Sequence, residues 1–180
     1  YRTRDAETAR EPGPEYLTSF ASDGSTLWAG SSRHGVFRRV VESAGAGEWL
    51  PVPTEGLPDL HTPLVATVGD TLFTATDRDG IYRYLAAEQR WIAVNEALTS
   101  RAVQCLDAAG DTLFAGTLEG LFRLDGEAWT PVNGGADPLA ICAVTGGQSS
   151  VYTGTWCGGV YRADDRGESW EALPRDGLDE

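Results

Sequence analysis

The sequence predicts an all-β fold, a β-propeller of four-stranded antiparallel blades, with four full blades preceded by an N-terminal half-blade. The first observation is a segment that recurs four times with the order apolar, aromatic, small, small, polar turn, Gly, aliphatic, aromatic, Arg. The second is its spacing, since the turn glycines Gly35, Gly80, Gly120 and Gly159 are 45, 40 and 39 residues apart. The third is a tryptophan after each copy, at Trp49, Trp91, Trp129 and Trp170. Four-stranded repeats of about 40 residues are typical of propeller blades.

Each repeat has room for four short strands, which we call A to D from the inside of the blade to the outside. In the third repeat they are AVQCLDA, TLFAGT, GLFRL and AWTPV. Alternating apolar residues and frequent β-branched and aromatic side chains favour strands over helices. The predicted organisation is a half-blade at 1–15 and blades at about 16–57, 58–98, 99–136 and 137–176.

The ends of the sequence match parts of a blade. YRTRDAETAREP at the start is similar to YRADDRGESWEALP of the last repeat, and so predicts C and D strands without their A and B strands. The absence of methionine indicates a processed chain or a segment of a longer protein. An open row of blades would expose apolar faces, so a homodimer is expected if the chain is an open propeller segment.

Composition restricts the partners. The chain has 180 residues, with 14 basic residues, all arginine, against 27 acidic ones, giving a net charge of -13. This charge disfavours nucleic acids and anionic membrane surfaces. No apolar run reaches the length of a membrane span, so membrane insertion is not expected.

The few metal-binding residue types argue against a cofactor or metal site. The three cysteines form no CxxC pair, and the chain has only two histidines. A zinc site is therefore not expected, and buried free thiols in a reducing compartment such as the cytoplasm are the interpretation we favour.

The last repeat carries a motif that resembles the Asp-box, Ser/Thr-x-Asp-x-Gly-x-x-Trp. Asp165, Gly167 and Trp170 match it, while Ala163 stands at the Ser/Thr position. The pattern is similar to that of bacterial-neuraminidase-type repeat propellers, including sortilin-type and photosystem II assembly-factor propellers. The resemblance implies that Asp165 builds a turn on the face opposite the ligand site.

The resemblance also implies that ligands bind the face formed by the B–C turns and the D–A linkers. These segments differ most among the copies, and variable loops on a repeated frame commonly carry function. The candidate ligand- or partner-binding residues are Arg33, His34, His61, Asp77, Arg78, Asp79, Arg101, Glu119 and Trp156.

Each candidate has a structural alternative. Trp156 can stack on a ligand or cover its own blade. The three arginines can hold a carboxylate or neutralise acidic neighbours, and the two histidines can titrate or remain solvated. The recurrent Arg38, Arg83, Arg123 and Arg162 are expected to pair with carboxylates of the frame, because they repeat with it.

Three function classes remain. The favoured one is a non-catalytic binding or assembly module for a protein or small ligand. The second is a sensory propeller of a larger signalling protein, since LWAGS and LFAGT are similar to repeats of two-component-regulator propellers. The third is a sialidase-type glycoside hydrolase, in which Arg33, Arg78 and Arg101 would form the arginine triad, although no Tyr–Glu pair lies in the predicted ligand-face loops.

Overall fold

The computed structural model describes residues 14–41, 47–133, 140–147, 150–164 and 166–174. These residues form four antiparallel sheets of four strands each, and no helix. The predicted fold class, a β-propeller with four full blades, is confirmed. The predicted N-terminal half-blade falls almost entirely on residues 1–13, outside the described part of the chain. No helix able to cross a membrane occurs among the described residues.

Each blade consists of four strands that are consecutive in the chain. Blade 1 contains β1 (Leu17–Ser22), β2 (Thr26–Ser31), β3 (Gly35–Val40) and β4 (Leu50–Pro51). Blade 2 contains β5 (Leu64–Val68), β6 (Thr71–Ala75), β7 (Ile81–Leu85) and β8 (Arg90–Ala93). Blade 3 contains β9 (Val103–Ala109), β10 (Thr112–Thr117), β11 (Gly120–Asp125) and β12 (Ala128–Pro131). Blade 4 contains β13 (Ile141–Gly146), β14 (Val151–Thr155), β15 (Gly159–Ala163) and β16 (Glu171–Ala172).

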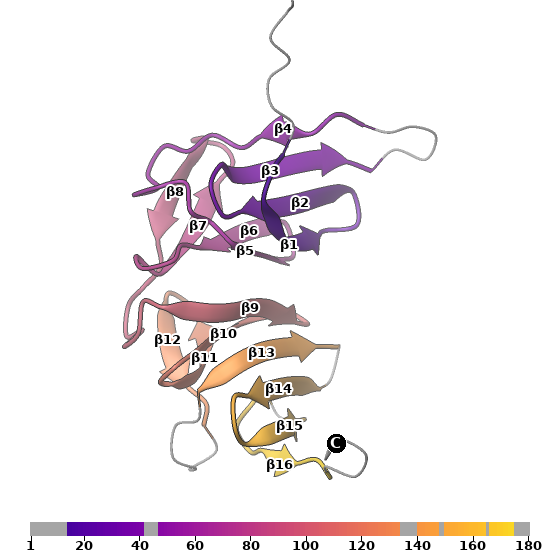
Figure 1. Cartoon of the computed structure of the whole chain (residues 1–180), viewed down its shortest axis with the longest axis vertical. Helices are drawn as coiled ribbons and strands as arrows, with labels where there is room; N and C mark the ends of the chain where they lie inside the picture. The colour runs from indigo at the N-terminus through magenta and orange to yellow at the C-terminus, as the bar shows by residue number, and fades with distance from the viewer. Residues whose placement is uncertain (1–13, 42–46, 134–139, 148–149, 165, 175–180) are drawn as a thin grey trace, which may run out of the picture.

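The blades follow one another around an arc, with the A strands inside and the D strands at the periphery (Figure 1). The A strands of neighbouring blades pack against each other, β1 on β5, β5 on β9 and β9 on β13. No comparable packing joins blade 4 to blade 1 among the residues described. The arc therefore has two open ends.

An apolar cluster fills each of the three interfaces between neighbouring blades. Val36 and Val52 of blade 1 pack with Leu72 and Trp91 of blade 2. Phe73 and Ile81 of blade 2 pack in the same way with blade 3, and Phe114 and Leu121 of blade 3 with blade 4. Burial on both faces explains why β10 is buried at every position.

The recurrent tryptophans also link neighbouring blades by hydrogen bonds. The indole N–H of Trp91 donates to the Pro53 carbonyl over 2.8 Å, and that of Trp129 donates to the Val94 carbonyl over 2.6 Å. Trp170 repeats the contact with the Val132 carbonyl, again over 2.6 Å. Each tryptophan thus binds the outer edge of the blade before it and buries its ring in the interface.

The recurrent arginines pair with carboxylates, as the sequence predicts, in blades 2 to 4. Arg83 reaches Glu127 of the next blade at 2.9 Å, and Arg162 reaches Asp164 at 2.7 Å. Arg123 binds both oxygens of Asp125 and donates to the Arg166 carbonyl of blade 4. For Arg38 no ion pair is found with a described residue.

The hairpin between β15 and β16 packs onto blade 3. Gly167 has a φ of +86°, which favours glycine, and a Cβ there would lie 3.3 Å from the ring of Phe114. Trp170 closes the turn by donating to the Gly167 carbonyl at 3.0 Å. Asp165, the predicted turn residue of the Asp-box, lies outside the described residues.

The expectation of buried thiols is wrong for two of the three cysteines. Cys142 is exposed at the register shift between Ile141 and Ala143, and Cys157 is exposed in a B–C turn. Cys105 is mostly buried between blades 3 and 4, and burial raises the pKa of its thiol to about 12.

We predict that Trp129→Phe lowers the free energy of unfolding by about 1–3 kcal/mol, because the buried Val94 carbonyl loses its donor and the smaller ring leaves a gap. Denaturant titration checks this, with Trp156→Phe as the matched control because that side chain is exposed. Equal stability of the two variants would show that the indole contact contributes little.

The Arg123–Asp125 pair predicts a pH effect. The hydrogen bonds from Arg123 hold the pKa of Asp125 below its ordinary value, so this pair stabilises the fold above about pH 4 and loses its effect as pH falls through the lowered pKa. Asp125→Asn should therefore be less stable than the parent at neutral pH by less than about 1 kcal/mol, since the carboxylate is partly solvated. Thermal unfolding at pH 7 and at low pH measures the difference, which should shrink in acid; a constant difference would contradict the assignment.

Candidate functional site

The candidate site is the turn face, which we define as the B–C turns between β2 and β3, β6 and β7, β10 and β11, and β14 and β15, with the D–A linkers beside them. The linkers contact the turns directly. The N–H of Gly35 donates to the Leu60 carbonyl at 2.9 Å, and the N–H of Ile81 donates to the Asn95 side chain at 2.8 Å. These contacts agree with the predicted placement of turns and linkers on one face.

A hydroxyl shapes each B–C turn, buried in blades 1 to 3 and half-buried in blade 4. Ser31, Thr76, Thr117 and Thr155 occupy the same position at or just after the end of the B strand. Thr117 donates to the Gly120 carbonyl at 3.1 Å and accepts from the N–H of Glu119 at 3.0 Å. Thr155 makes the equivalent bonds with Gly159 and Gly158. The hydroxyls satisfy the backbone of the turn, so the side chains at its tip remain outside the frame.

Asparagines in two linkers complete this frame. Asn95 and Asn133 accept from the N–H of Ile81 and of Leu121, at 2.8 and 2.9 Å. Gly80 and Gly120 have positive φ, and a Cβ at either would collide with the asparagine oxygen. The sequence signal for this role is the Val-Asn pair that directly follows the D strand of blades 2 and 3.

In blade 1 the turn face carries an aromatic and basic cluster. The guanidinium carbon of Arg33 lies 4.6 Å from the ring centre of Tyr16, a cation–π distance. The ring of His34 stacks on the same tyrosine, with centres 6.0 Å apart. Tyr16 is absent from the predicted site; an aromatic residue just before the first A strand was the available signal. His61 lies in the following linker, where its backbone N–H donates to the Asp59 carboxylate at 2.8 Å.

In blade 2 the turn face is charged. Arg78 pairs with Asp77 at 3.3 Å, yet 88% of its side chain is exposed. The N–H of Asp79 is bound by Thr76, and the Asp79 carbonyl accepts from Asn95. Burial is the largest cause of a raised pKa at Tyr82 below this turn; Asp79 raises it further, and Arg101 lowers it. Arg101 also lies next to this turn, since a Cβ at Gly80 would lie 3.0 Å from its Cδ.

Blades 3 and 4 present apolar side chains at the turn face. Trp156 is 64% exposed at the tip of the last turn, where its backbone N–H donates to the Ala140 carbonyl. Leu118, at the tip of the preceding turn, is 55% exposed, and Glu119 is exposed beside it. Leu118 was not among the predicted site residues, although an apolar residue in an otherwise polar turn could have indicated it. More than half of each of these two side chains is exposed, so neither is fully packed against its own blade.

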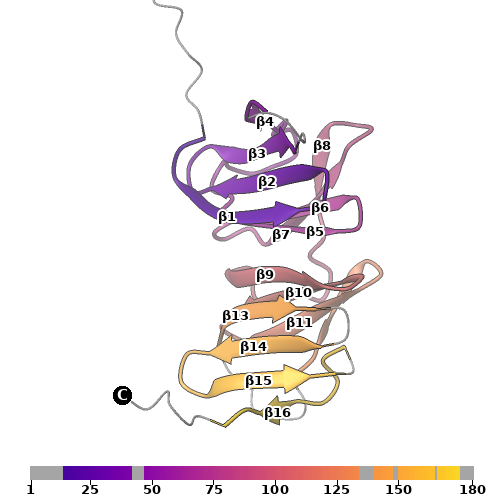
Figure 2. The same cartoon turned by 90° about the vertical axis from the view of Figure 1, so that its right-hand side faces the viewer.

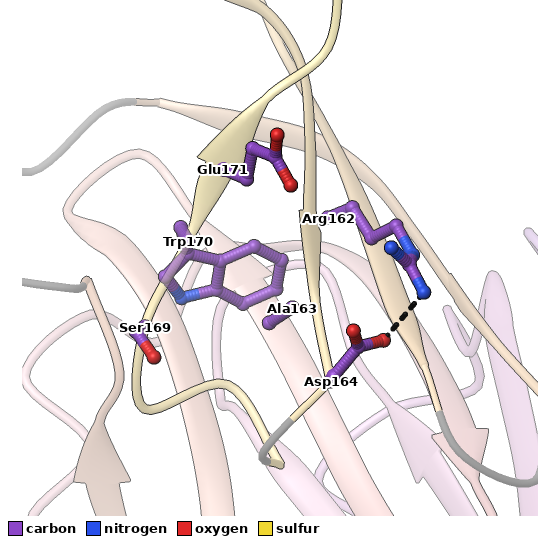
Figure 3. A pocket seen from close by; sticks show the side chains of 6 residues that line it. All are labelled: Arg162, Ala163, Asp164, Ser169, Trp170 and Glu171. Carbon is purple, nitrogen blue, oxygen red and sulfur yellow. Dashed lines mark ion pairs between the residues drawn. The ribbon is translucent and has the colours of Figure 1, made fainter.

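Two hollows of the structure lie away from these turns. One of about 420 Å³ lies between blades 1 and 2 and is lined by Trp28, Arg38 and Tyr84, among others. A second, of about 280 Å³, lies at the β15–β16 hairpin, where the indole of Trp170 stands beside the Arg162–Asp164 ion pair (Figure 3). Among the described residues no group of three or more His, Cys, Asp or Glu side chains is arranged to hold a metal ion.

The comparisons with known proteins identify the fold alone. No known protein family matches the chain, and no curated protein matches it significantly. Among solved structures, the RRP9 WD40 repeats superpose with a TM-score of 0.66 at 16% identity, over 88% of this chain and 51% of that one. YCF48 bound to a D1 peptide gives 0.64 at 11% identity, over 91% and 54%. The extracellular domain of a putative hybrid two-component system from B. thetaiotaomicron gives 0.66 at 17% identity, over 87% and 21%.

This chain therefore spans about half of two of these structures and a fifth of the third. The neighbours are WD40, peptide-bound and signalling-protein propellers, which supports the predicted repeat architecture. The resemblance to Asp-box repeats remains a prediction.

Proposed function

We propose that the chain is a non-catalytic binding propeller of the Asp-box type that recognises a protein segment through its turn face. The observation that carries the proposal is the separation of roles in the turns. Ser, Thr and Asn side chains satisfy the backbone of the turns, while the tips present exposed side chains that differ from blade to blade. An exposed tryptophan that the frame does not need is a typical anchor for a partner.

The face has two chemically different halves, which favours an extended partner over a small ligand. Blades 1 and 2 present Tyr16, Arg33, Asp77 and Arg78, whereas blades 3 and 4 present Leu118 and Trp156. The two hollows described above lie away from this face. A peptide with an apolar anchor next to charged residues matches this arrangement, and one similar propeller, YCF48, is itself bound to a peptide.

A sensory propeller would use the same face, and the similarity to an extracellular domain of a putative two-component system keeps this candidate. For a sialidase, the structure gives Arg33 and Arg78 partners on their own blades, Tyr16 and Asp77. Because these partners compete with a substrate carboxylate, the arrangement favours binding over hydrolysis. Turnover of a chromogenic sialoside that disappears in Arg78→Ala would reverse this preference.

The role of Trp156 separates binding from packing. We predict that Trp156→Ala changes the free energy of unfolding by less than about 0.5 kcal/mol, because the side chain is largely exposed. Denaturant titration of the variant beside the parent measures this. A loss of about 2 kcal/mol or more would assign Trp156 to the packing of its own blade.

Selection of random peptides displayed on phage tests the binding role. Peptides enriched on the parent chain should lose at least about tenfold in affinity against Trp156→Ala, and keep it against Arg90→Ala, a charged residue outside the turn face. Calorimetry with the synthetic peptides gives the affinities. Selected peptides that bind all three chains equally, or no enrichment at all, would contradict the proposal.

A further inference from the structure

Blade 4 exposes the face that every earlier blade buries. We call the side of a blade that meets the following blade its leading face, and the opposite side its trailing face. In blade 3 the leading face contains Phe114 and Leu121, both buried against blade 4. Tyr152 occupies the position of Phe114, since it pairs with Arg162 as Phe114 pairs with Arg123. Phe114 is 1% exposed and Tyr152 is 38% exposed, so the leading face of blade 4 is apolar and uncovered.

Two further residues extend this uncovered face. Val160 takes the place of Leu121 and is exposed, and Leu173, half-buried, takes the place of Val132. The backbone around Leu173 is formed as in the other blades. Its N–H donates to the Val160 carbonyl at 2.9 Å, just as the N–H of Val132 donates to Leu121 at 2.9 Å. The carbonyl that receives an indole in blades 2 and 3, at Val94 and Val132, therefore has a counterpart at Leu173.

Blade 1 exposes the matching trailing face. Phe20 pairs with Ala29 as Val65 of blade 2 pairs with Thr74, so the two side chains are equivalent. Val65 is buried against blade 1 and only 3% exposed, whereas Phe20 is 57% exposed. The ring of Phe20 contacts Trp49 at a centre distance of 6.4 Å. Together with Leu27, these residues reproduce the apolar set that blades 2 to 4 insert into their interfaces.

Trp49 is the donor that this junction requires. The indole N–H groups of Trp91, Trp129 and Trp170 all bind a carbonyl of the preceding blade. For Trp49 no hydrogen bond from the indole to another described residue is found, because no blade precedes blade 1 in the described part of the chain. The two ends of the arc thus hold the donor and the acceptor of one more interface of the same kind.

Both open faces point to the same side of the molecule, as Figure 2 shows with the sheets of blades 1 and 4 in front and blade 2 behind. We propose that two copies of this chain associate head to tail, with blade 1 of each copy seated on blade 4 of the other, and close a ring of eight blades. The same type of interface already joins neighbouring blades three times within the chain, and the second copy would form it again at each open end.

The symmetry makes a specific demand on the interface. Each junction joins two different faces, and a two-fold axis produces both junctions at once and leaves no free end. Each copy has a net charge of -13, which opposes association at low salt. The dimer is therefore expected to strengthen as salt screens this repulsion. The proposal is independent of the binding role of the turn face.

Sedimentation velocity over a dilution series at moderate salt tests the ring. The parent chain of 19.3 kDa should sediment as a species of twice that mass. Val160→Asp and Phe20→Asp alter side chains that are exposed in the single copy, so circular dichroism should show both folded. Each should weaken association by more than about 100-fold, because a carboxylate would be buried in the junction. Leu118→Asp, on the turn face, is the control and should remain dimeric.

Mixing the two variants gives the decisive measurement. Val160→Asp keeps its trailing face and Phe20→Asp keeps its leading face, so an equal mixture should form a heterodimer through one junction. A monomeric parent, a dimer that survives both substitutions, or a mixture that stays monomeric would overturn the proposal. A ladder of trimers and longer species would also overturn it, because the faces would then join without closing the ring.

Discussion

The contact between consecutive blades is the interaction on which the rest of the structure depends. A single sheet of this chain cannot bury both of its faces, and each becomes a stable layer only against a neighbour. The apolar part of the contact is nondirectional, whereas the indole N–H of Trp91, Trp129 or Trp170 fixes where one blade sits on the other. Register between blades and burial of their faces are thus set by the same side chain.

This frame explains how the turn face can vary. The backbone of each B–C turn is satisfied by a hydroxyl such as Thr117 and, in two blades, by a linker asparagine. These contacts involve the backbone of the turns and not the side chains at their tips. Arg78 and Trp156 can therefore differ in size and charge without altering the strands below them, which is the condition for a recognition surface on a repeated scaffold.

The fold was predictable because each blade packs against its neighbours with the same pattern of apolar, glycine and tryptophan residues. The glycine of each B–C turn marks a turn, and the tryptophan in or just before each D strand marks the outer part of a blade, so their spacing located the blades. The candidate site was harder to predict, because variable positions lack such a pattern. Arg33 and His34 were selected as separate polar groups, and their stacking on Tyr16 depends on how the chain enters β1. Cys142 was misjudged because a register shift, invisible in the sequence, turns it outward.

The purely neighbour-to-neighbour packing has a consequence for how the chain unfolds. In a repeat array of this kind, stability is approximately a sum over blades and over the junctions between them. Blades 2 and 3 each have two junctions, whereas blades 1 and 4 have one apiece among the described residues. In a single copy, local opening should then begin at the ends of the arc, and amide protons of β6 and β10 should exchange more slowly than those of β2 and β14. The chain behaves as a short row of coupled blades and not as a globule with a single core. Whether it unfolds as a unit therefore depends on the strength of the coupling between neighbouring blades and not on any single contact.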